Sequence, residues 1–217
     1  MTVNGGLGSG LPRRERKGSP MAPRLVLVAH AATAATRNGA FPIDEAVERP
    51  AEIGPVEHRA AQVLSGPELR CTQTAAALGW RPTVIPGLAD LDAGDWAGQD
   101  LGDLFATEPD AVQRWMTDPA AKPPGGESLM DLVRRVGEVL DGLDWPDGRT
   151  VIVTTPLVIR AAITHLLQAQ LLFAIDIEPL SASTLTGHGG RWKLRALMPR
   201  AVWDGSSGVD RGVLEGQ

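Results

Sequence analysis

The stretch LVLVAHAAT, residues 25–33, decides the fold of this chain. It opens with an unbroken apolar run rich in Val and Leu, which is typical of a strand buried on both faces in a parallel sheet. The run ends at His30, and in open α/β sheets ligands bind at the carboxyl ends of such strands. Taken alone, a core histidine that closes a strand would explain the pattern better than a site would, so the interpretation depends on the rest of the chain.

The composition narrows the class of protein. The length of 217 residues predicts one large domain, and a hydrophobic content of 43% supplies a sizeable core. The net charge of −5 argues against a nucleic-acid-binding protein, which normally carries a basic surface. The single cysteine, Cys71, rules out an internal disulfide. Because no apolar run reaches the roughly 18 residues of a membrane span, we expect a cytoplasmic protein that binds neither nucleic acid nor membrane.

The chain divides into three parts on composition. Residues 1–22 are rich in glycine, carry a small basic cluster and have little apolar content, which predicts a disordered N-terminal arm. Residues 23–199 hold the periodic segments and predict one domain. Residues 200–217 are rich in Gly, Ser and Asp, and they predict a flexible C-terminal tail.

Strand patterns alternate with helix patterns through the domain. A loop over residues 31–55 follows the first strand and predicts a lid or pocket wall. The remaining segments are strands at 61–65, 82–88 and 150–154, helices at 68–78 and 157–171, a helix opened by a capping box of Ser128 and Asp131, two short helices within 100–118, and a hairpin over 179–186 and 192–197. This alternation predicts an α/β fold, a three-layer sandwich with a mainly parallel central sheet.

Two segments at strand ends carry charged side chains. Arg70 falls in the first turn of the helix after the second strand, where a guanidinium beside a helix N-terminus can clamp an anion. A surface arginine would fit the same spacing about as well. The loop over residues 88–98 contains Asp90, Asp92 and Asp95. Any of the three could act as an acid, and all three could be solvated loop residues.

These segments together resemble the histidine phosphatase superfamily, which includes the cofactor-dependent phosphoglycerate mutases. The resemblance covers residues 24–199 and rests on five motifs in the family's order. They are Ala29–Thr33 for the family's Arg-His-Gly-x-Thr, Ser65–Ala75 for Ser-x-x-x-x-Arg-Ala-x-Gln-Thr-Ala, Leu88–Gly98 for Leu-x-Glu-x-x-x-Gly-x-x-x-Gly, Pro124–Ser128 for Pro-Gly-Gly-Glu-Ser, and Thr154–Ala161 for Ser/Thr-His followed by Ile-Arg-Ala. The resemblance implies a phosphoglycerate mutase-like fold and a phosphohydrolase activity.

The resemblance also implies catalytic roles for three residues. His30 would attack phosphorus and become phosphohistidine, Arg70 would hold phosphoryl oxygens, and Asp90 stands where an acid protonates the leaving group. Two positions that hold the phosphoryl group depart from the family: Ala29 replaces its first arginine and Thr155 its second histidine. The family's acid is also shortened, from glutamate to Asp90. Because the loss of one preorganised donor typically lowers a rate on the order of 10²–10³, we expect a weak or altered phosphohydrolase.

Four residues are expected to bind substrate: Thr33, Thr36, Arg37 and Thr155. Thr33 belongs to the first motif, and Thr36 stands where the family often has an asparagine that helps to hold phosphate. Thr155 can donate one hydrogen bond. As a replacement for the missing cation we favour Arg37 over Arg160, because Arg160 matches a family arginine that is usually structural.

Three functions stay open from the sequence. The first is the weak or altered phosphohydrolase. The second is an enzyme that uses the same pocket for non-phosphoryl acid/base chemistry in a biosynthetic pathway, since fewer cations suit a less anionic ligand. The third is a catalytically silent protein that binds a ligand or regulates a partner. In each case we expect a small-molecule ligand, anionic for the first function, without a cofactor or a metal, because the histidines lack metal-ligand spacing; a homodimer is compatible with all three.

Overall fold

The structure of the protein is a computed structural model, which describes residues 22–56, 59–170 and 172–200. Apart from residues 22 and 200, the predicted N-terminal arm and C-terminal tail lie outside the described residues. One six-stranded sheet runs through the domain in the order β3-β2-β4-β1-β5-β6. Its strands are β1 (Arg24–Ala29), β2 (Gln62–Ser65), β3 (Thr83–Val84), β4 (Arg149–Thr154), β5 (Ala182–His188) and β6 (Arg191–Met198).

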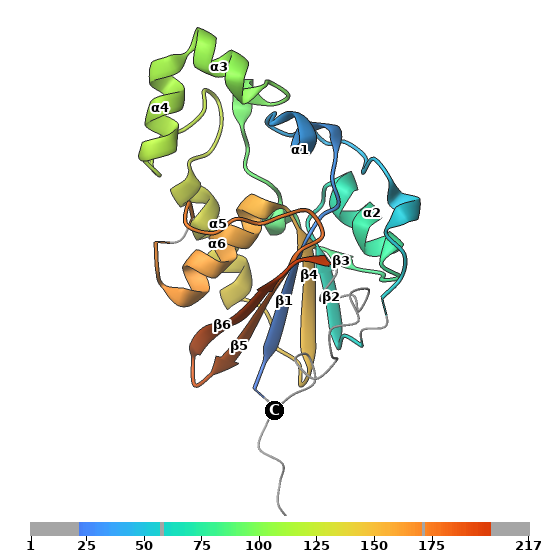
Figure 1. Ribbon diagram of the computed structural model, residues 1–217. Coiled ribbons are helices and arrows are strands. Elements are labelled where there is room, and N and C mark those ends of the chain that lie inside the picture. Colours follow the sequence, from blue (N-terminus) through green and yellow to red (C-terminus); the bar gives the residue numbers. More distant parts are fainter. Residues whose placement is uncertain (1–21, 57–58, 171, 201–217) are drawn as a thin grey trace, which may run out of the picture.

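Helices connect the strands on both faces of the sheet (Figure 1). The α-helices are α1 (Ala34–Asn38), α2 (Leu69–Ala77), α3 (Leu101–Thr107), α4 (Pro109–Thr117), α5 (Leu129–Asp141) and α6 (Pro156–Leu167), and the 3-10 turns are η1 (Pro50–Glu52), η2 (Pro86–Leu88) and η3 (Gly94–Trp96). Figure 1 shows α5 and α6 together on one side of the sheet, α2 on the other, and α3 with α4 beyond the carboxyl edge of the parallel strands.

The predicted α/β class and mainly parallel sheet are confirmed. β1 pairs in parallel with β4, β4 with β2, and β2 with β3. β5 and β6 form the predicted hairpin, and β5 runs antiparallel to β1 at the far edge. All four parallel strands therefore end at the same edge of the sheet, which is the edge where the fold can assemble a site.

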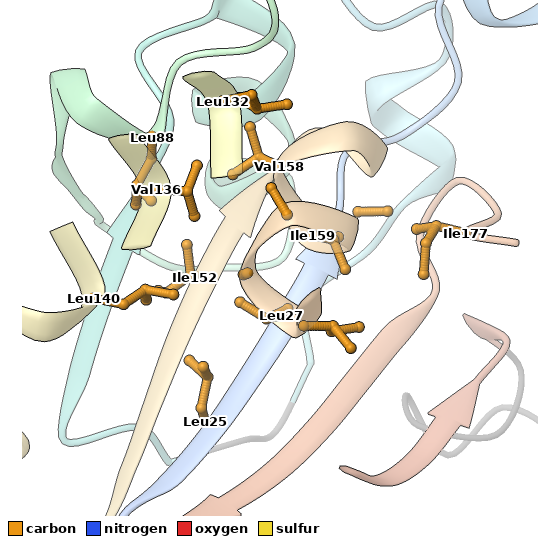
Figure 2. Packing of buried hydrophobic residues seen from close by; sticks show 14 of the residues in the cluster. Leu25, Leu27, Leu88, Leu132, Val136, Leu140, Ile152, Val158, Ile159 and Ile177 are labelled. Atoms are coloured by element: carbon orange, nitrogen blue, oxygen red, sulfur yellow. The ribbon is translucent and has the colours of Figure 1, made fainter. Parts of the chain in front are cut away.

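The main core lies between the sheet and the pair α5–α6. Figure 2 shows Leu27 of β1 and Ile152 of β4 beneath Val158 and Ile159 of α6. The predicted capping box opens α5: the Ser128 hydroxyl accepts from the backbone N–H of Asp131, and the Asp131 carboxylate accepts from the backbone N–H of Ser128. The apolar residues that recur along this helix are buried, as their period predicts: Leu129, Leu132, Val136 and Leu140.

Two smaller clusters complete the packing. On the opposite face of the sheet, Val28, Val151 and Val153 meet α2, so both faces of β1 and β4 are buried as the apolar runs predict. Beyond the carboxyl edge, Phe41 packs against Trp96 with ring centroids 5.6 Å apart and against Trp115 at 5.3 Å. This ring cluster joins the loop that follows β1 to α3 and α4.

Three predicted boundaries are corrected. The strand predicted over 82–88 is only Thr83–Val84, because Pro86 lacks the N–H that a continuing ladder would need and opens η2 instead. The helix predicted over 157–171 ends at Leu167, where Gln168 adopts a left-handed conformation with φ 51°. The loop predicted over 31–55 contains the short helices α1 and η1. Within the described residues, no helix combines the length and the apolar composition of a membrane span.

We expect Ile152→Ala to lower the free energy of unfolding by about 2–5 kcal/mol, because it opens a cavity at a fully buried position of the central strand β4. Met130→Ala on α5 is the control, since its side chain is 60% exposed and should change stability by less than about 0.5 kcal/mol. Urea unfolding followed by circular dichroism measures both. Equal unfolding midpoints for the two variants would contradict the assignment of this core.

Candidate active site

Four predicted site residues follow four adjacent parallel strands. His30 comes directly after β1 and Thr155 directly after β4. Arg70 lies in the first turn of α2, which follows β2, and Asp90 lies just after η2, which follows β3. Because these strands end at one edge (Figure 1), the fold places the four residues at the same edge of the sheet.

His30 is held in one orientation by its own neighbourhood. Its backbone N–H donates to the carbonyl of Thr154 at 3.0 Å, which fastens it to the end of β4. Its Nδ1–H donates to the carbonyl of Ala31 at 2.7 Å, and the residue is only 4% exposed. A carbonyl can only accept, so the proton is on Nδ1 and the Nε2 lone pair is left for attack or for proton abstraction.

Burial lowers the pKa of His30 below its ordinary value, because it disfavours the imidazolium. The positive charge of Arg70 acts in the same direction, whereas the hydrogen bond to Ala31 and the charges of Asp90 and Glu45 oppose the shift. The imidazole is therefore neutral at neutral pH, and this is the form in which Nε2 is nucleophilic.

Arg70, Asp90 and Thr155 form one bonded unit. The Arg70 Nη2 donates to Asp90 Oδ2 at 2.7 Å, and the Thr155 hydroxyl donates to Asp90 Oδ1 at 2.8 Å. The Arg70 Nη1 donates to the Ile43 carbonyl at 2.8 Å. Arg70 is 1% exposed and Thr155 is fully buried, so these contacts form in a largely water-free environment.

Thr74 connects the segment of His30 to the segment of Arg70. Its hydroxyl accepts from the backbone N–H of Ala31 at 2.9 Å and donates to the carbonyl of Arg70 at 2.7 Å. The same hydroxyl therefore bonds Ala31, whose carbonyl accepts from the His30 ring, and the turn that carries Arg70. Thr74 lies in the second motif, Ser65–Ala75, but was not among the predicted site residues.

The predicted pocket wall after β1 is tied to the first turn of α2. In this loop Asp44 Oδ1 accepts from the backbone N–H of Leu69 at 2.8 Å, beside the contact between Ile43 and Arg70. Glu45 Oε1 accepts from the backbone N–H of Ala35 in α1 at 3.1 Å. Nothing in the sequence pattern singled out Ile43 or Glu45, because their roles depend on how the loop turns back.

Two charged side chains fix the peptide groups around Asp90. Glu68 Oε1 accepts from the Asp90 N–H at 2.6 Å, and Arg135 Nη2 donates to the Asp90 carbonyl at 3.2 Å. Arg135 Nη1 also donates to two preceding carbonyls, and its guanidinium pairs with Glu127. Glu127 in turn accepts from the N–H of Asp92 at 3.1 Å, so it helps to fix this loop.

Other predicted residues lie outside this bonded unit. The Arg37 guanidinium is 62% exposed and pairs with Glu48, and no hydrogen bond or ion pair within the described chain joins it to His30. The hydroxyls of Thr33 and Thr36 are 3.0 Å apart, and Thr33 caps α1. The structure thus does not bring Arg37 among the bonded groups, and substrate contacts of these three residues stay predictions.

The positions that depart from the family motif are both buried. Ala29 is fully buried in the core between the sheet and α6 and carries no charge. Arg160 does not take its place, because its Nη2 lies 3.5 Å from Asp176. Among the loop acids, Asp90 faces Arg70, whereas Asp92 Oδ1 accepts from the N–H of Gly94 at 3.0 Å.

The remaining titratable candidates offer no second reactive centre. Cys71 is fully buried. Burial first, followed by the charge of Glu68, raises the pKa of its thiol well above the ordinary value, so the thiol is unreactive. Among the described residues, no group of three or more His, Cys, Asp and Glu side chains could hold a metal ion.

The sequence of this chain matches the model of a known protein family. A model described as the histidine phosphatase superfamily (branch 1) matches residues 51–198, a segment that contains Arg70, Asp90 and Thr155 and begins after His30. The Bifunctional protein Rv2228c of Mycobacterium tuberculosis is 34% identical over 100 residues, which are 44% of this chain and 28% of that protein. The chain therefore aligns with only a small part of the curated relatives that it matches.

Solved structures share nearly the whole domain. Mycobacterial hydrolase 1 is 25% identical with a TM-score of 0.68, over 81% of this chain and 97% of that one. The complex of mycobacterial glucosyl-3-phosphoglycerate phosphatase with inorganic phosphate is also 25% identical, with a TM-score of 0.69 over 83% and 99%. Alpha-ribazole phosphatase from Shigella flexneri, 20% identical with a TM-score of 0.70 over 82% and 96%, shows the fold alone.

We expect the His30 imidazole to titrate below the ordinary histidine value of about 6.5, because burial disfavours its charged form. Glu45→Gln should lower the pKa further, since the charge of Glu45 raises it. NMR titration of the ring protons measures both midpoints. A midpoint at or above the ordinary value, or an upward shift in the variant, would be inconsistent with the geometry of the site.

We expect Arg135→Met to lower the free energy of unfolding by about 2 kcal/mol, because Glu127 loses its ionic partner and three carbonyls lose a donor. Arg134→Met is the matched control on the same helix, since that guanidinium is 64% exposed and pairs only with other surface side chains. Urea unfolding should leave the control at the wild-type midpoint. Similar losses in both variants would show that Arg135 has no special role.

Proposed function

Because the chain belongs to the histidine phosphatase superfamily (branch 1), we propose that it is a phosphohydrolase in which His30 attacks the phosphorus of a phosphate monoester. The observation that carries this proposal is the hydrogen bond from His30 Nδ1 to the Ala31 carbonyl. It leaves the Nε2 lone pair of a neutral imidazole free beside Arg70 and Asp90.

The reaction would proceed in two steps. In the first, a bond forms between Nε2 and phosphorus while the bond from phosphorus to the ester oxygen breaks, and Asp90 in its acid form gives a proton to the departing oxygen. In the second, Asp90 as carboxylate takes a proton from water, which attacks phosphorus and releases phosphate and the neutral His30. Arg70 would hold the phosphoryl oxygens throughout.

The site supports a slow reaction. Phosphoryl transfer depends mainly on positioning and on stabilisation of charge. At the two departing positions this chain has the buried methyl group of Ala29 and the hydroxyl of Thr155, neither of which carries charge. Each missing donor is expected to lower the rate on the order of 10²–10³, and the combined loss need not be the product of the two.

A second candidate function is acid/base chemistry on a less anionic substrate in the same pocket. The observation that favours it is the local balance of charge. Arg70 is already paired with Asp90, Glu68 contacts the Asp90 peptide, and the charge of Glu45 acts on His30. Arg70 and Arg135 are both paired with carboxylates. The further carboxylates of Glu68 and Glu45 disfavour a dianionic ligand, while the neutral imidazole is suited to act as a general base.

We expect His30→Gln to reduce the hydrolysis of p-nitrophenyl phosphate by at least about 10³-fold, because the nucleophile is removed. His188→Gln is the matched control, since this histidine is exposed at the end of β5 and should leave the rate unchanged. Steady-state assays give kcat and KM, and intact-protein mass spectrometry should show one acid-labile phosphoryl group on wild type.

Each alternative gives a different result in these assays. Equal phosphatase rates in wild type and His30→Gln would contradict the nucleophilic role. If no phosphoryl group appears and wild type turns over no phosphate ester, the phosphohydrolase proposal is wrong. Turnover of an uncharged metabolite that depends on both His30 and Asp90 would then favour acid/base chemistry, and ligand-dependent melting without turnover would favour a binding protein.

A further inference from the structure

The Asp90 carboxylate is hydrogen-bonded to Arg70 and Thr155, the two residues that are expected to hold a phosphoryl group. Its Oδ2 accepts from Arg70 Nη2 at 2.7 Å, and its Oδ1 accepts from the Thr155 hydroxyl at 2.8 Å. These two donors come from different strand ends and converge on one carboxylate. In this state Asp90 is bonded where an oxyanion would be bonded.

The Asp90 carboxylate leaves one donor of Arg70 without an acceptor in the described part of the chain. Arg70 Nε is buried and has no hydrogen-bond partner among the described residues, although Nε and Nη2 form one edge of the guanidinium fork. Asp90 uses only Nη2 on that edge, because its other oxygen is held by Thr155 and by the backbone N–H of Leu91 at 2.9 Å. A buried donor without an acceptor calls for an explanation, and an oxyanion that bridges the whole edge would provide it.

We propose that an oxyanion binds Arg70 and Thr155 by displacing the Asp90 carboxylate, and that Asp90 takes up one proton from solvent in the exchange. The proposal rests on the proposed function in taking the phosphoryl group of the substrate as that oxyanion. The displaced carboxylate loses its cation and its hydroxyl donor, and its side chain is 12% exposed. Loss of these partners beside a new negative charge favours the neutral acid.

This exchange would prepare the acid that hydrolysis needs. A carboxylate paired with Arg70 holds no proton for the departing ester oxygen. When the phosphoryl group takes Arg70, the same event that positions the substrate converts Asp90 to its protonated form. The proton taken from solvent then passes to the ester oxygen as the bond to phosphorus breaks, and Asp90 as carboxylate takes a second proton from the attacking water. After phosphate leaves, Asp90 returns this proton to solvent and pairs with Arg70 again.

The His30 imidazole is a rival destination for the proton. An anion bound beside His30 would also favour the imidazolium, so the two sites must be separated by experiment. The charged and titratable groups around Asp90 are His30 after β1, Arg70, Glu68 and Cys71 on and beside α2, Arg135 on α5, and Glu45 in the loop after β1.

Sulfate is the probe, because it stays dianionic over the pH range of the experiment and so carries no proton of its own. Isothermal titration calorimetry at about pH 7, in two buffers with different ionisation enthalpies, counts the protons taken up per sulfate bound. Wild type should take up close to one proton. His30→Gln should keep this uptake, whereas Asp90→Asn should lose it and bind sulfate at least about tenfold more tightly, because Arg70 is no longer neutralised.

Asp92→Asn is the matched control, since Asp92 lies on the same loop and bonds the N–H of Gly94 rather than Arg70. It should match wild type in both affinity and proton uptake. Sulfate binding by wild type without proton uptake overturns the proposal without reference to any variant, and so does the absence of sulfate binding. If proton uptake is lost in His30→Gln but kept in Asp90→Asn, the proton goes to the imidazole, and this result also contradicts the proposal.

Asp90→Asn must be folded for its affinity to count, so its melting curve is compared with that of wild type. The sulfate measurements do not depend on turnover. If sulfate displaces Asp90 but no phosphohistidine forms, the exchange is supported and the proposed function is contradicted. If phosphohistidine forms but sulfate binds without uptake of a proton, the proposed function is supported and the exchange is contradicted.

Discussion

The ion pair between Arg70 and Asp90 is the interaction on which the site depends. Both side chains are largely shielded from water, and a buried charge is stable only when it is paired and hydrogen-bonded. The fold meets this requirement from several directions: the Ile43 carbonyl accepts from Arg70, and the Thr155 hydroxyl donates to Asp90. The segments after β2, β3 and β4 are thereby joined at one point, and the positions of the other groups follow from it.

Around this pair, the candidate catalytic groups are held by hydrogen bonds to neighbouring residues. Thr74 joins the turn of Arg70 to Ala31, whose carbonyl orients His30. Glu68 accepts from the N–H of Asp90, and Arg135 donates to its carbonyl. These contacts are hydrogen bonds, so the position of each of these groups depends on specific donors and acceptors as well as on apolar packing.

Much of the fold and the gathering of the site residues could be predicted from the sequence. The apolar runs that became β1 and β4 and the capping box of α5 are local signals, and their order places His30 and Thr155 at one edge. The sequence could not show which side chains form hydrogen bonds or ion pairs with one another in the site. In the sequence, Arg135 is a polar residue of an amphipathic helix, and its bond to Asp90 depends on how a distant loop folds. Arg37 was predicted to bind substrate, but its guanidinium pairs with Glu48.

The ring cluster of Phe41, Trp96 and Trp115 connects the wall of the site to the helices α3 and α4. Because Phe41 belongs to the same loop as Ile43, the wall that contacts Arg70 cannot shift without disturbing two indole rings. The chain has six tryptophans and no tyrosine, so its ultraviolet emission comes from indole alone. Intrinsic fluorescence is consequently a label-free optical signal for the approach of any ligand that moves this wall.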